Sequence, residues 1–218
     1  MVTATLQATG PAATLLALVG ADGTAAADHA RALLDPAAPV RDLADAIHAL
    51  CALHGAFPGL VDHARLSPAA ADVAAWLEFA AAAVARERTL LARLTAAIGP
   101  LPSTPGQAAS ENAVMGQRHA LEMLARSDRA GCAAGTAFAF VLDWSAVRMV
   151  LDAAALRIGV PAGDDFDPVV RHTRAVLQDL APPSSTQRAM VFGAQQMLAQ
   201  HRGLWHLLEA RASARDRR

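Results

Sequence analysis

Apolar residues recur along the middle of the chain at steps of three and four, which is the spacing of one buried helix face. The clearest series reads Val73, Leu77, Ala80, Val84, Glu87, Leu91, Leu94 and Ile98. Every member is apolar except Glu87. A buried carboxylate is costly unless it is ion-paired, hydrogen-bonded, protonated or bound to a metal. The pattern therefore marks Glu87 as part of either a structural network or a site.

Two further segments share this feature. The segment 129–157 is apolar on nearly all sides at its centre, which predicts a central helix, and Asp143 interrupts it. A second apolar series, near the end of the chain, reads Met190, Ala194, Met197, His201, Leu204 and Leu208. His201 is the one polar member of that series. Three helices therefore each place one titratable group where apolar packing is expected.

Helical spacing and helix-breaking residues divide the chain, and strand-like alternation is nearly absent. Helices are expected over residues 11–19, 24–34, 40–54, 67–98, 107–125, 129–157, 168–180 and 185–211. Short links make the three middle helices antiparallel neighbours. We predict an all-α, antiparallel helical bundle in a single domain, residues 1–218. Its four-helix core spans residues 67–212, the helices of residues 1–66 pack on one end or side, and residues 213–218 form a frayed basic tail.

Composition narrows the class of protein. Hydrophobic residues make up 54% of the chain and charged residues only 18%, which predicts extensive helix–helix burial or self-association. Close helix packing is also expected at the glycines within helices, Gly116, Gly131, Gly135, Gly193 and Gly203. The absence of Lys and Tyr and the abundance of Ala are typical of a GC-rich bacterial genome, so the arginines do not indicate a nucleic-acid partner.

The sequence also indicates the cellular location of the protein and the state of its two cysteines. No basic residue precedes Arg31, so a signal peptide is not expected, and the apolar stretch 130–142 is too short to span a bilayer. Cys51 and Cys132 are far apart and have no CxxC partner, so we expect buried free thiols. The sequence predicts a soluble, cytoplasmic protein without a membrane partner.

The polar interruptions can be placed relative to one another. If consecutive helices pack antiparallel, Glu87 and Asp143 fall within about 5 Å of one level along the bundle, at a rise of about 1.5 Å per residue. Glu111 belongs to the same stretch of the intervening helix. The level of His201 stays open because a long connection precedes its helix.

A bundle with Glu87, Glu111, Asp143 and His201 facing inward resembles the ferritin-like family over roughly residues 68–211. In that family, carboxylates and histidines on four helices bind two irons. The resemblance implies an iron or manganese site formed by these four residues. The Glu-x-x-His motif of the family is absent, and the chain has the reverse order twice, at His119-Ala-Leu-Glu122 and at His206-Leu-Leu-Glu209.

A structural alternative uses the same carboxylates without a ligand. Arg86 and Arg88 flank Glu87, and Arg118 and Arg148 lie on neighbouring helices. Buried carboxylate–arginine pairs would satisfy Glu87 and Asp143, because ion networks stabilise buried carboxylates as readily as metal sites do. A lone histidine such as His201 would then donate to a backbone carbonyl.

The remaining titratable clusters have a simpler interpretation. His48, His54, Asp62 and His63 surround a Gly- and Pro-rich loop without metal-ligand spacing, so solvated loop residues are expected there. The acidic loop 163–167 lacks the alternation of a calcium loop. No phosphate loop, HExxH or GxSxG motif occurs.

Three functions remain open. The first is a binding or interaction protein, in which the polar core residues serve packing and register. The second is a non-haem metal oxidoreductase that uses Glu87, Glu111, Asp143 and His201. The third is a helical pocket for an apolar small molecule, which Met and Trp side chains near His201 suit. Nucleic-acid binding is not expected, because the one basic cluster is the tail 211–218.

Overall fold

The computed structural model describes residues 10–217, and within them every regular element is helical. Two elements, η1 and η2, are 3₁₀ helices. In chain order the elements are α1 (Pro11–Asp22), η1 (Thr24–Ala26), α2 (Asp28–Ala32), α3 (Val40–His54), α4 (Leu60–Leu66), η2 (Pro68–Val73), α5 (Ala74–Ala97), α6 (Gln107–Ala125), α7 (Cys132–Ile158), α8 (Asp167–Asp179) and α9 (Ser184–Asp216). The all-α prediction is confirmed for the described residues.

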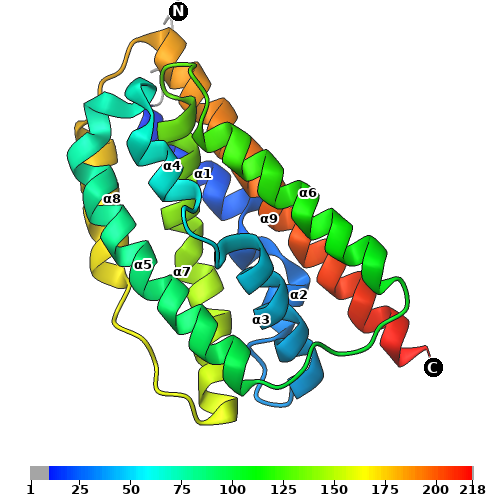
Figure 1. The fold of residues 1–218 in the computed structure, drawn as a ribbon. Helices are drawn as coiled ribbons and strands as arrows, with labels where there is room; N and C mark the ends of the chain where they lie inside the picture. The colour runs from blue at the N-terminus through cyan, green and yellow to red at the C-terminus, as the bar shows by residue number, and fades with distance from the viewer. Residues whose placement is uncertain (1–9, 218) are drawn as a thin grey trace, which may run out of the picture.

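Helix α7 lies at the centre of the molecule, as its apolar composition predicts. It contacts α1, α3, α4, α5, α6, α8 and α9, and its longest contact is with α9 (Figure 1). Glycines allow this close approach, because a Cβ at Gly135 would lie 2.0 Å from the backbone oxygen of Met190 and one at Gly193 would lie 2.3 Å from that of Cys132. Gly116 does not serve packing in this way, since a Cβ there would meet no atom within 4 Å.

The arrangement of α5 and α6 differs from the predicted hairpin. These two helices make no extended contact, and α3 and α4 lie between them and pack on both (Figure 1). The extended loop from Gly99 to Gly106 allows the chain to diverge here. Helices α3 and α4 are thus part of the core.

The apolar series of α5 and α9 are buried as predicted. In α5, Leu77, Ala80 and Leu91 are fully buried and Glu87 is only 3% exposed; in α9, His201 is 1% exposed. The end of α9 differs from the prediction. The helix continues to Asp216 instead of ending at residue 211, because buried arginines on its last turns find acidic partners on α3.

No single helix in residues 10–217 is long and apolar enough to span a bilayer. Only two segments taken together, Leu60–Leu66 and Ala70–Ala97, reach that length and hydropathy, and they meet at a bend of 116°.

Candidate functional site

A line of hydrogen-bonded polar side chains crosses the apolar core, with Asp143 of α7 at its centre. Asp143 is 1% exposed. Its Oδ1 accepts the backbone N–H of Thr24 at 2.7 Å, and its Oδ2 accepts the Thr24 hydroxyl at 2.6 Å and His201 Nδ1 at 2.7 Å. A Cβ at Gly23 would lie 2.4 Å from Asp143 Oδ1, so glycine there lets the turn before η1 approach the carboxylate. These bonds satisfy a carboxylate that the sequence placed in an apolar helix.

The line continues from His201 to a second histidine. His201 Nε2 and His54 Nε2 are 2.9 Å apart, and both rings are buried. One of these two nitrogens must carry a proton and the other must accept it. Burial holds the pKa of His54 well below its ordinary value, and the nearby His201 lowers it further. His54 is therefore neutral in the folded protein near pH 7.

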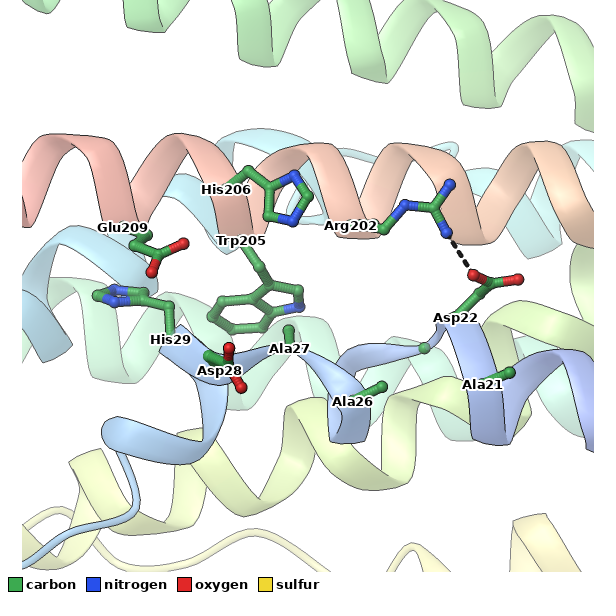
Figure 2. Close-up of a pocket in the computed structure, with 11 residues that line it drawn as sticks. Ala21, Asp22, Ala26, Ala27, Asp28, His29, Arg202, Trp205, His206 and Glu209 are labelled. Atoms are coloured by element: carbon green, nitrogen blue, oxygen red, sulfur yellow. Dashed lines mark hydrogen bonds and ion pairs between the residues drawn. The ribbon is translucent and has the colours of Figure 1, made fainter.

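Each end of this line reaches a hollow. At one end, Trp205 Nε1 donates to the Thr24 hydroxyl at 2.9 Å, and its ring lies in a polar hollow of about 140 Å³ (Figure 2). His29 and Glu209 face each other at one side of this hollow, and Arg202 bonds to Asp22 at the other.

At the opposite end, His54 lines a hollow of about 20 Å³ together with Arg118 and Glu122 of α6. Arg118 Nε donates to Glu122 at 3.1 Å, so these two charges pair with each other. A volume of this size holds one water molecule and no substrate. The line of side chains from Trp205 to His54 thus ends at a polar hollow of about 140 Å³ on one side and at room for one water molecule on the other.

Glu87 belongs to a different network, although one of its partners, Trp144, directly follows Asp143 in the chain. Trp144 Nε1 donates to Glu87 Oε2 at 2.9 Å, and Arg148 Nη1 donates to Oε1 at 2.7 Å. Arg148 also donates to the backbone oxygen of Asp164 and to Asp152. Burial raises the pKa of Glu87, and the bonds from Trp144 and Arg148 oppose that rise. The structural alternative, a buried carboxylate–arginine pair, is confirmed for Glu87.

A third buried network joins the end of α9 to α3. Arg211 Nε donates to Asp45 Oδ2 at 2.8 Å, and Arg211 Nη2 lies 2.8 Å from Asp45 Oδ1. Arg215 bridges Asp45 and Asp42 at 2.7 and 2.8 Å and also donates to Thr104 at 2.8 Å. Two arginines and two aspartates thus balance in charge at this junction.

A groove of about 320 Å³ lies between α3, α6 and α9, next to the Arg211–Asp45 pair. Its apolar lining residues are Ala49, Ala52, Leu101, Val114, Met115, Leu207 and Leu208. Its polar lining residues are Asp45, His48, Gln107, Ser110, Glu111 and Arg211. Mostly apolar walls with a few polar groups, at a volume of at least about 300 Å³, are typical of small-molecule sites.

The four residues predicted to bind metal do not converge. Asp143 and His201 bond to each other, Glu87 pairs with Arg148, and Glu111 is exposed at the groove, where it accepts Gln107 Nε2 at 2.7 Å. Within residues 10–217, no group of three or more His, Cys, Asp or Glu side chains is arranged to hold a metal ion.

The comparisons with known proteins give one result. A family model described as a family of unknown function, DUF6975, matches residues 19–216. The chain belongs to this family. Neither the curated proteins nor the solved structures included a significant match. For this DUF6975 protein, function must therefore be argued from its own geometry.

In this DUF6975 chain, the residues that flank the Gly- and Pro-rich loop contact different partners. His48 Nε2 bonds to the Gly99 oxygen, Asp62 accepts Arg88 Nη1 at 2.8 Å, and Arg126 contacts His63. The expectation of solvated loop residues was wrong for His54, Asp62 and His63. His54 ends α3, Asp62 and His63 belong to α4, and all three are at least nine-tenths buried.

Two members of these networks, His54 and Arg211, were not predicted from the sequence, although both continue a series of apolar residues spaced by three and four. His54 is the last member of a series on α3, Leu43, Ile47, Leu50 and His54, and all four are buried. Arg211 extends the α9 series by the same spacing beyond Leu208. The three-and-four criterion that singled out Glu87 would therefore have found both.

Proposed function

We propose that the protein is a small-molecule binding protein and that its ligand site is the groove between α3, α6 and α9. The supporting observation is the combination of volume and lining: about 320 Å³, walled by apolar side chains and by a few buried polar groups. The sequence favoured a binding or interaction protein, and this proposal adds the kind of partner, a small molecule, and the place where it binds. It also corresponds to the alternative of an apolar ligand in a helical bundle, at a location away from His201.

The lining suits a compact apolar body. Met115 is 53% exposed, so a ligand that covers it gains hydrophobic free energy, and its unbranched side chain adapts to different shapes. A dry apolar cavity of about 150 Å³ binds benzene. The groove therefore has room for an apolar body about twice that size.

The metal oxidoreductase alternative has less support. Glu87 and Asp143 already have partners in Arg148, Thr24 and His201, so a metal would have to displace buried hydrogen bonds. The ferritin-like four-helix core, self-association and cytoplasmic location stay predictions from sequence.

A fluorescence titration tests the proposal. The neutral apolar dye 1-N-phenylnaphthylamine should bind saturably, with one dye per chain, and brighten as it leaves water. Ala52→Trp places an indole in the groove from an exposed position on α3, so it should abolish saturable binding. Ala85→Trp, at an exposed position of α5 outside the groove, is the matched control and should bind like the wild type.

Circular dichroism would verify that both variants fold. Absence of saturable binding, or saturable binding that Ala52→Trp leaves unchanged, would contradict the proposal.

A further inference from the structure

The groove lining contains a buried donor without a partner. The Arg211 side chain is 6% exposed, and Asp45 engages its Nε and Nη2. Its Nη1 has no hydrogen-bond partner among residues 10–217. Buried N–H groups are almost always bonded, because an unsatisfied one forfeits its hydration. A ligand oxygen in the groove would supply the acceptor that Arg211 lacks.

The same lining contains a buried acceptor without a partner. Gln107 Nε2 donates to Glu111, whereas Gln107 Oε1 is buried and has no partner within the described residues. An amide oxygen accepts but cannot donate. A ligand N–H or O–H group would therefore complete the bonding of Gln107, just as a ligand oxygen would complete that of Arg211.

The charges around the groove decide between a charged and a neutral ligand. Asp45 and Asp42 neutralise Arg211 and Arg215, so these arginines carry no surplus positive charge. Glu111 adds a negative charge and has no cationic partner in the part of the chain that the structure describes. A carboxylate or phosphate would approach a site of zero or negative net charge and would lose its hydration without compensation.

We infer that the groove takes an uncharged ligand whose apolar body carries a head with both an acceptor and a donor, such as a carboxamide, and that it discriminates against the matching carboxylate. The acceptor meets Arg211 Nη1 and the donor meets Gln107 Oε1. This inference rests on the proposed function and adds the chemical class of the ligand. Specificity of this kind arises because a polar site rejects a head that leaves its buried groups unpaired or adds repulsion.

Competition against 1-N-phenylnaphthylamine tests the head group with three matched probes: octanamide, octanoate and octylammonium. Octanamide should displace the dye with a dissociation constant at least tenfold below that of octanoate. Gln107→Leu should weaken octanamide several-fold relative to the dye, because the dye has no polar head that needs Gln107.

Removal of the unpaired charge supplies a second, independent readout. Glu111 is exposed, so Glu111→Gln should fold normally, and it should strengthen octanoate binding several-fold relative to octanamide. Glu78→Gln, at an exposed site on α5 outside the groove, should change neither.

The outcomes separate the two proposals. Dye binding that Ala52→Trp abolishes, together with octanoate or octylammonium binding as tightly as octanamide, would overturn the head-group inference and leave the proposed function intact. Failure of the dye to bind would overturn both. A dimer that Ala52→Trp disrupts, without dye binding in the wild type, would assign the groove to a second copy of the chain and would also overturn both.

Discussion

The buried histidine pair predicts a specific loss of stability in acid. The pKa of His54 is held well below its ordinary value of 6.5 by burial and by the neighbouring His201. In the unfolded chain His54 takes up a proton near pH 6.5, whereas in the folded protein it remains neutral to a much lower pH. The unfolded state therefore binds more protons between these two values, and stability must fall as pH decreases.

The size of this effect follows from proton linkage. The contribution is RT ln(1 + 10^(6.5 − pH)), which amounts to about 1.4 kcal/mol between pH 7.5 and 5.5. The pKa values of His29 and His63 are also lowered by burial, so they add to the loss. Glu87 has the opposite effect on how stability changes with pH. Burial raises its pKa above 4.5, so its contribution to stability is present in acid and is lost as pH rises through the folded-state pKa.

Urea denaturation followed by circular dichroism at pH 7.5, 6.5 and 5.5 would isolate the His54 contribution. His54→Gln keeps a hydrogen-bonding group beside His201 but does not titrate, so its stability should fall less steeply with acid, by about 1.4 kcal/mol over this range. His119→Gln, which changes an exposed histidine on α6, should follow the wild-type curve. Parallel curves for wild type and His54→Gln would refute the reasoning.

Two further predictions concern packing and buried charge. Gly135→Ala should destabilise the protein by about 2–3 kcal/mol, because its Cβ would lie 2.0 Å from the Met190 oxygen. Gly116→Ala should stabilise the protein by about 0.5–1 kcal/mol, because a Cβ there meets no atom within 4 Å. Urea denaturation midpoints measure both effects, and equal effects would contradict the close contact of α7 with α9. Arg148→Met should lower the free energy of unfolding by about 3–5 kcal/mol, because Glu87 is then buried without its cation. The double variant with Glu87→Met should recover most of that stability in thermal denaturation. No recovery would show that the lost ion pair is not the cause.

Local patterns predicted the helices well, because helix spacing and helix breakers act over a few residues. Helix α3 has the predicted bounds of residues 40 and 54, and α6 has those of residues 107 and 125. Helix α4 was missed because its seven residues, Leu60–Leu66, are too short to display a helical period. The identities of Glu87, Asp143 and His201 as buried polar groups were likewise predictable from spacing alone.

Partners were much harder to predict, because they depend on how distant segments dock. The alternatives for Asp143 were a metal or an arginine, yet its bonds come from Thr24, 119 residues away, and from His201. No local pattern marks Thr24 as a partner. The insertion of α3 and α4 between α5 and α6 is a second example, since short loops favoured a simple hairpin.

The line of side chains from Trp205 to His54 also constrains how the chain is made. Its hydrogen bonds join residues 24 and 205, 24 and 143, and 54 and 201. During synthesis, His54 and Asp143 are made before α9, so both lack His201 until α9 has emerged. Contacts of such large sequence separation form late in folding. A nascent chain without α9 would expose the apolar face of α7 and unpaired polar groups together, so the interval before α9 emerges is the period when this protein is most exposed to aggregation.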